Sequence, residues 1–238
     1  MRIDKDKCVT CGQCMLYCPV DAMVNKGDYV EINYDECTEC YNCKRQEVCP
    51  VDALYQEELE WPRTVRSILS DVLSIAEESQ ISGRGTEEMK TNEVTGRFKE
   101  GYAGVAIELG RPIAGTRMYD VEKVAKAVAG TEGLVFEDEN PVTSLMVDKS
   151  TGEFREDVLN ERAISAIIEF LIPRDKLLEV VKKLEDVAEE IETLFSLDVA
   201  SRIDENNEIP TEKILKEAGY DVYPNGKTNL GLGKPRVI

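Results

Sequence analysis

Hydrophobic and polar positions along the chain predict a mixed α+β protein whose regular elements lie mainly after residue 100. The apolar run over 163–172 is rich in isoleucine and predicts a buried strand, whereas Leu177, Val181 and Leu184 recur at helical spacing. The expected elements are strands over 102–109, 134–136, 142–147, 163–172 and 194–203, and helices over 120–129 and from Pro173 to about Ile191. Within this series we expect a β-α-β-β-α-β order, a split βαβ arrangement, which we assign to residues 101–205.

A second apolar stripe precedes that region, within residues 59–80. After Trp61-Pro62, apolar residues recur at helical spacing and predict a connecting amphipathic helix to about Glu78, namely Val65, Ile68, Leu69, Val72, Leu73 and Ala76. A helix with one apolar stripe needs a surface to cover it. We expect this stripe to pack on the neighbouring domain rather than on a membrane or a separate partner.

Residues 81–100 form a polar segment punctuated by glycines, without apolar periodicity. Arg84, Lys90 and Arg97, beside threonines and glycine N–H groups, could bind an anion or a partner. The segment lacks the Gly-Lys-Ser/Thr ending of a phosphate-binding loop, and its composition favours a flexible linker. After it, residues 206–238 predict a short helix over 211–218 and a C-terminal tail with a surface position.

The eight cysteines of the chain all lie in its first 49 residues, in two copies of one pattern. The first copy is Cys-x2-Cys-x2-Cys-x3-Cys-Pro, and the second has five residues before its last cysteine instead of three. Both fourth cysteines open the same pentad, Cys-Pro-Val-Asp-Ala, which indicates an internal duplication. The members are Cys8, Cys11, Cys14 and Cys18 in the first copy, and Cys37, Cys40, Cys43 and Cys49 in the second.

This spacing suits a cluster of several irons, because three closely spaced thiolates surround one face and proline turns the chain away after the fourth. The alternatives are zinc and disulfides. Zinc prefers four ligands from Cys-x2-Cys pairs, often with histidine, and this chain has no histidine. A disulfide framework suits a small secreted protein, and we find no signal peptide.

On these residues, the segment over 1–58 resembles the bacterial-type ferredoxins that carry two 4Fe-4S clusters. The resemblance covers about a quarter of the chain, and it implies that each fourth cysteine crosses over to the other cluster. One cluster would then be bound by Cys8, Cys11, Cys14 and Cys49, and the second by Cys37, Cys40, Cys43 and Cys18. The two extra residues within 44–48 leave the ligands intact but put the potential expected from the family in doubt.

Each cluster also needs an apolar surrounding, and a hairpin around residues 25–28 is expected to help form it. The candidate residues are Val9, Val20, Val24, Ile32, Tyr34, Val48, Val51 and Leu54, and we expect Tyr17 and Tyr41 to pack against the clusters as well. By topology alone, residues 101–205 resemble a ferredoxin-like or ACT-like α/β sandwich. Topology alone identifies no ligand.

The formal charge of −18 argues against nucleic acid and anionic membranes as partners and favours a basic docking patch on another protein. No apolar run approaches the roughly 20 residues of a membrane span. Thiolate ligands and the absence of an export signal indicate the reducing cytoplasm. The absence of histidine excludes Rieske-type ligation and histidine-based acid–base chemistry.

We find no catalytic constellation in the sequence, and Glu108 with Arg111 is expected to be a structural ion pair. The leading hypothesis is therefore an electron carrier, or a non-catalytic subunit of an oxidoreductase, rather than an enzyme. The resemblance implies a low potential and a partner such as an anaerobic oxidoreductase, with the C-terminal domain fixing the partner or a homo-oligomer. Two alternatives are a redox-linked regulatory protein with an ACT-like sensor, and an accessory reductase subunit with a substrate or cofactor site at 82–97.

Overall fold

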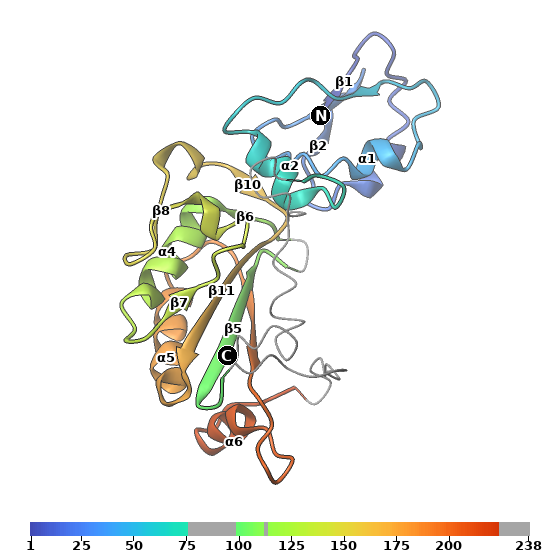
Figure 1. Ribbon diagram of the computed structural model, residues 1–238. Helices are drawn as coiled ribbons and strands as arrows, with labels where there is room; N and C mark the ends of the chain where they lie inside the picture. The colour runs from blue at the N-terminus through green and yellow to red at the C-terminus, as the bar shows by residue number, and fades with distance from the viewer. Residues whose placement is uncertain (76–98, 112–113, 224–238) are drawn as a thin grey trace.

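The computed structural model describes residues 1–75, 99–111 and 114–223. Figure 1 shows a small N-terminal unit, an α/β unit below it, and helix α2 (Thr64–Ser70) where the two meet. Within these residues, no helix is both long and apolar enough to cross a membrane. The predicted anion or partner loop, with Arg84, Lys90 and Arg97, lies outside the described residues.

The N-terminal unit has short elements joined by long connections. Strand β1 (Arg2–Ile3) pairs with β4 (Leu54–Tyr55), and β2 (Met23–Asn25) pairs with β3 (Val30–Ile32) as the predicted hairpin. The turn of this hairpin needs Gly27, whose φ is 97° and whose N–H donates to Asn25 Oδ1 at 2.8 Å. Each cysteine run carries one helical turn, η1 (Gln13–Tyr17) in the first and α1 (Asn42–Arg45) in the second.

The α/β unit is built on a four-stranded antiparallel sheet in the order β12-β5-β11-β7. Its strands are β5 (Tyr102–Leu109), β7 (Val135–Phe136), β11 (Ala166–Pro173) and β12 (Phe195–Ala200). Helices α4 (Met118–Ala129) and α5 (Leu177–Ala188) pack side by side on one face of this sheet (Figure 1). Helix α4 connects the first two of these strands and α5 the last two, which is the element order expected from the sequence.

The prediction of a strand over 142–147 is wrong for the first half of that range. Residues Thr143–Leu145 form the 3-10 helix η2, and β8 (Met146–Asp148) pairs with β9 (Glu153–Phe154) as a hairpin outside the main sheet. The physical reason is Asn140, whose side-chain oxygen accepts the N–H groups of Val142 at 2.7 Å and Thr143 at 3.3 Å. This local bonding starts a helical turn in a segment whose composition favours a strand.

Two other boundaries also differ. Pro173 is the last residue of β11, after which η4 (Arg174–Lys176) leads into α5, and α5 ends at Ala188 rather than near Ile191. The apolar run over 163–172 is divided, since β10 (Arg162–Ala163) pairs separately with β6 (Thr116–Arg117). The remaining elements are the 3-10 helix η3 (Glu156–Val158) and the expected short helix α6 (Pro210–Glu217), which packs on α5.

The connecting helix is shorter than its apolar stripe predicts. Helix α2 ends at Ser70 because Asp71 adopts an extended conformation and its Oδ1 accepts the N–H of Leu73 at 3.0 Å. Val72 and Leu73 are consequently 60% and 71% exposed, so their expected place in the stripe is wrong.

The other end of the stripe behaves as expected. Val65 and Leu69 are buried in the hydrophobic core of the α/β unit. The N-terminal unit has a separate and smaller core, which is formed by Met1, Cys14, Met23, Val30, Ile32, Cys43 and Leu54. The apolar side of helix α2 therefore packs in the core of the α/β unit.

Candidate metal centres

The eight cysteines line two cavities of the N-terminal unit, four in each. Each cavity has an empty volume of about 330 Å³ and takes three cysteines from one run and the fourth from the other. The first cavity is lined by Cys8, Cys11, Cys14 and Cys49, and the second by Cys18, Cys37, Cys40 and Cys43. These are the two groups that the resemblance to ferredoxins implies.

The internal duplication extends to the backbone. The third residue of each copy has a positive φ, 57° at Thr10 and 54° at Glu39, and so has the aspartate of each pentad, 51° at Asp21 and 48° at Asp52. Residues other than glycine adopt this conformation at a cost, so its repetition marks a shared geometric requirement.

Backbone N–H groups point at the sulfur atoms in both copies. The N–H of Ala22 donates to Cys18 Sγ at 3.1 Å, and the N–H of Ala53 donates to Cys49 Sγ at 3.2 Å. A third such bond, 3.5 Å long, joins the N–H of Val30 to Cys8 Sγ. Donors of this kind stabilise negative charge on a thiolate and tune the potential of an iron–sulfur centre.

The cavities are otherwise apolar. Five of the expected sheath residues line them, and so do Tyr17 and Tyr41; these five are Val9, Val20, Ile32, Val51 and Leu54. Of the other three, Val24 is exposed, Val48 packs on the core of the unit, and the ring of Tyr34 lies between Arg2 and Arg63. Sequence reasoning missed Met1, Ile3, Met23 and Val30, although the alternation along the hairpin points to Met23 and Val30.

The two extra residues of the second run change the backbone of that run. They let α1 form where the first copy has a 3-10 turn, and Glu47 takes a positive φ of 52° that has no counterpart in the first copy. Lys44 then forms an ion pair with Asp52 of the second pentad. Cys49 still lines the first cavity, so the insertion does not displace the ligand position.

The chemistry of the cavities fits a sulfur-bound metal cluster. All eight cysteines are free thiols, and no three described Cys, Asp or Glu side chains converge on a single ion. The sulfur atoms instead surround a cavity, as ligands of a group wider than one ion must. The buried hydroxyl of Thr38 also lines the second cavity, beside Cys37 and Cys40.

Burial opposes ionisation of these thiols. It raises the pKa of Cys43 to about 12, with a further contribution from Cys40, and burial likewise raises the pKa of Cys14, Cys37 and Cys40. Thiolates bind metals, and a cationic metal core offsets the cost of ionising several neighbouring thiols. The cavities are therefore suited to thiolates only when such a core is bound.

Charged side chains that the sequence did not single out converge on the second cavity. Glu39 is 2% exposed and pairs with the amino group of Met1 and with Arg63, whose Nε lies 2.8 Å from Glu39 Oε1. Burial alone would raise the pKa of Glu39, but its hydrogen bonds and the charges of Met1 and Arg63 lower it overall. Glu39 is therefore a buried carboxylate held in its charged form.

The α/β unit supplies further cations to the same side. Arg66 of α2 is 3% exposed, pairs with Glu161, and donates to the carbonyl groups of Asp35 at 2.6 Å and Cys37 at 2.9 Å. Arg117 pairs with Asp35 at 2.6 Å and with Glu36 at 2.9 Å. Single arginines and glutamates carry no periodic signal, which is why the sequence did not reveal this network.

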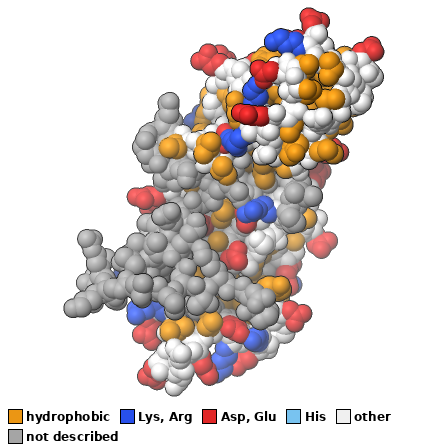
Figure 2. Space-filling view, turned by 90° about the vertical axis from the view of Figure 1, so that its right-hand side faces the viewer, with side chains coloured by type: hydrophobic (Ala, Val, Ile, Leu, Met, Phe, Trp, Pro, Cys, Tyr) orange, Lys and Arg blue, Asp and Glu red, His pale blue; other side chains and the backbone are white. Residues whose placement is uncertain are grey.

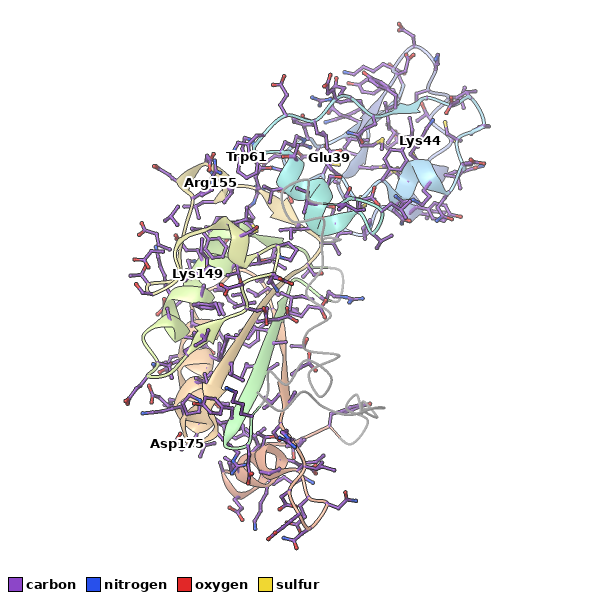
Figure 3. All side chains as sticks on the ribbon, in the orientation of Figure 1. Glu39, Lys44, Trp61, Lys149, Arg155 and Asp175 are labelled. Carbon is purple, nitrogen blue, oxygen red and sulfur yellow. The ribbon has the colours of Figure 1, made fainter. Side chains whose placement is uncertain are left out.

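Other polar contacts lie away from the residues that line the two cavities. Arg111 and Glu108 form the expected ion pair, at 3.0 Å. At the other end of the interface between the two units, Trp61 donates to Asp157 at 2.5 Å, and Arg155 stacks on its ring (Figure 3).

Comparison with known proteins shows similarity for this N-terminal unit. The family model for a 4Fe-4S binding domain matches residues 1–24. Pyruvate synthase subunit PorD of Methanothermobacter marburgensis is 44% identical over 55 residues, which cover 23% of this chain and 62% of that subunit. Subunit delta of the NADH-dependent phenylglyoxylate dehydrogenase of Aromatoleum evansii is 38% identical over 48 residues, 20% of this chain and 50% of the subunit.

A third relative is matched over most of its length. The ferredoxin-like protein in the vnf region of Azotobacter vinelandii is 37% identical over 59 residues, which are 24% of this chain and 91% of that protein. No solved structure matches the chain. The family model, this relative and the four-cysteine cavities agree, and the chain belongs, through its N-terminal unit, to the 4Fe-4S ferredoxin family.

Proposed function

We propose that this chain is an electron-transfer protein that holds two 4Fe-4S clusters as a low-potential one-electron path to a partner oxidoreductase in the reducing cytoplasm. The observation that carries the proposal is the division of eight cysteines between two cavities, each with three cysteines from one run and one from the other. Cys8, Cys11, Cys14 and Cys49 are the proposed ligands of the first cluster. Cys18, Cys37, Cys40 and Cys43 are the proposed ligands of the second.

When bound, such clusters supply one-electron redox chemistry with little change in geometry. The residues of this chain bind them, exclude water with apolar side chains, and donate N–H groups to the thiolates of Cys8, Cys18 and Cys49. The interlocked runs keep the two sites adjacent in one small unit, which suits transfer of an electron from one site to the other.

The first site opens toward the surface. Cys11 is exposed, and Val9 and Val51, which line that cavity, are 58% and 38% exposed. Figure 2 shows hydrophobic side chains gathered over the N-terminal unit, where Leu16 is also exposed. An apolar patch beside an exposed ligand is suited to contact with a redox partner, and the charge of −18 favours a basic rim on that partner.

The names of two relatives support a role in an oxidoreductase complex, since PorD and subunit delta are subunits of a pyruvate synthase and of a dehydrogenase. The matches leave the α/β unit uncovered. For that unit, over 101–205, we propose a role in specifying the partner or an oligomer.

Serine variants of single cysteines test the crossed arrangement. Protein purified without oxygen is expected to contain eight irons and eight sulfides by the count of two 4Fe-4S clusters, and reduction should bleach its visible absorption. Cys14→Ser and Cys49→Ser should perturb the same electron paramagnetic resonance (EPR) signal, although they lie in different runs, and Cys18→Ser should perturb the other. Stoichiometric zinc in a colourless protein would refute the proposal, and a Cys49→Ser variant that affects the same signal as Cys43→Ser would refute the crossed ligand sets.

A further inference from the structure

The second cavity lies beside the α/β unit, and a third arginine of that unit, after Arg66 and Arg117, pairs with a residue next to it. Arg162 of β10 is 17% exposed at its side chain and pairs with Glu36, the residue before Cys37. Its Nη2 donates to the carbonyl group of Ala114 at 3.0 Å, and its buried Nε has no hydrogen-bond partner among the described residues. The guanidinium is thus held in place by its neighbours while one of its donors stays unused.

The segment that follows Cys18 contacts the same place. A Cβ atom on Gly115, whose φ is 69°, would lie 3.2 Å from Arg162 Nε and 3.3 Å from a methyl carbon of Val20. Gly115 thus has Arg162 and Val20 as near neighbours, and Val20 is two residues after Cys18. Burial lowers the pKa of Arg162, whereas the charges of Asp35 and Cys18 raise it, so Cys18 is within electrostatic reach.

We propose that Arg162 tunes the second centre, raising the reduction potential of the cluster held by Cys18, Cys37, Cys40 and Cys43, so that this potential depends on the docking of the α/β unit. The inference rests on the proposed function. Reduction adds one electron to the cluster and takes it, with its four thiolates, from a charge of about −2 to about −3. A nearby positive charge favours the more negative state and raises the potential.

Both positive and negative side chains surround this centre. We therefore predict the direction in which the reduction potential shifts when one charge is removed, rather than the effect of the summed charge. The cations around this centre include Arg45, Arg63, Arg66, Arg117, Arg162 and the Met1 amino group, and the anions include Asp35, Glu36, Glu39, Asp71 and Glu161. Arg162 differs from Arg63 and Arg66 in coming from the strand pair β10–β6 and in sharing the neighbour Gly115 with Val20, after Cys18. Near the first cavity, by contrast, Lys44 pairs with an exposed aspartate, where solvent screens its charge.

The test is a redox titration of the complete iron-loaded chain, followed by the EPR signal of each reduced cluster. Arg162→Gln is expected to lower the one-electron reduction constant of one cluster roughly tenfold, which equals about 59 mV, and to leave the other unchanged. Arg162→Lys keeps the positive charge, so its reduction potentials should stay close to those of the chain without substitutions. Glu36→Gln removes the paired anion and should shift the same cluster in the opposite direction.

Arg155→Gln is the matched control, because Arg155 also lies where the two units meet but stacks on Trp61, apart from the cysteine cavities (Figure 3). It should leave both potentials unchanged. The proposal is overturned if Arg162→Gln keeps both clusters with unaltered potentials, or if Arg162→Gln and Glu36→Gln shift the potential in the same direction. If Arg162→Gln fails to retain iron, an unaltered potential in Glu36→Gln overturns it.

These outcomes separate the inference from the proposed function. If the chain without substitutions contains fewer than two clusters, by iron and sulfide content, the proposed function is refuted and the inference with it. If the chain without substitutions contains two clusters and Arg162→Gln leaves both reduction potentials unaltered, only the inference is refuted.

Discussion

At the scale of single residues, the most constrained position outside the cysteines is Glu39. It lies between Cys37 and Cys40, has a positive φ, and keeps its carboxylate charged while almost fully buried. A buried charge is stable only with its partners in place, here Arg63 and the Met1 amino group. Glu39 therefore ties the start of the chain and the start of α2 to the second cysteine run.

Replacing this carboxylate should destabilise the N-terminal unit. Glu39→Ala leaves the guanidinium of Arg63 without its buried partner, and we expect a loss of about 3–5 kcal/mol of unfolding free energy. The measurement is denaturant unfolding of iron-loaded protein, followed by loss of cluster absorption. Glu57→Ala is the control, since Glu57 pairs with Arg2 at the surface and should cost at most about 1 kcal/mol. Equal effects of the two variants would contradict a buried ion-pair role.

At the scale of elements, α2 shows how a periodic pattern is interrupted by one side chain. The apolar stripe continues in the sequence past Ser70, but Asp71 binds the N–H of Leu73 and also Arg45 of the cysteine unit. Periodicity correctly predicted which surface Val65 and Leu69 cover. It did not predict the end of the helix, because that end depends on a contact with a residue 26 positions away.

Two leucines of this stripe provide a test. Leu69→Ala removes a side chain that is 1% exposed in the α/β core, so we expect a loss of about 2–5 kcal/mol. Leu73→Ala should change stability by no more than about 0.5 kcal/mol, because Leu73 is exposed. Thermal and denaturant unfolding followed by circular dichroism measures both. A large loss in Leu73→Ala would mean that the helix continues beyond Ser70.

The turn between β8 and β9 depends on Gly152 in a way that composition alone does not reveal. Its φ is 74°, and a Cβ atom there would lie 2.6 Å from the carbonyl carbon of Ala125 in α4. We expect Gly152→Ala to cost about 2–4 kcal/mol, since both the conformation and the backbone contact oppose a side chain. Gly130→Ala is the control, because its φ is not positive and nothing lies within 4 Å of the added atom. Circular dichroism melting of both variants should show a large loss for Gly152 only.

At the scale of the whole molecule, the two units have separate cores of unequal size. The core of the α/β unit spans its sheet, α4, α5 and part of α2, whereas that of the N-terminal unit has few members, two of them cysteines. Small domains rarely bury enough apolar surface to fold without a metal or a cross-link. The N-terminal unit should therefore depend on bound 4Fe-4S for folding, and the α/β unit should not.

Removal of iron tests this difference. After oxidation and chelation, we expect backbone amides of residues 1–58 to lose protection from hydrogen exchange, since metal binding and folding are coupled in such units. Amides of β5 and β11 should keep theirs, because that sheet is closed by its own core. The iron-loaded protein is the control. Loss of protection across both units together would show that they fold as one.

The sequence by itself determined the cofactor class and the element order, because ligand spacing and apolar periodicity are local properties that survive in any context. Eight cysteines in two matching runs predict thiolate ligation, and the isoleucine-rich and helical patterns after residue 100 correspond to the observed sheet and its two helices. The ion pair of Glu108 and Arg111 could be predicted from the sequence for the same reason, since the two residues are three positions apart.

The tertiary structure alone decided which charges surround the second centre. Arg66, Arg117 and Arg162 come from three different elements, and each finds its acidic or carbonyl partners near Cys37 only after the two units have docked. It likewise brought Asn140 to Glu169 and Asp71 to Arg45, and these distant contacts hold the two side chains that start and end helical turns through local hydrogen bonds. Contacts between distant residues leave no period in a sequence, so the position of these charges follows from the packing of one unit on the other.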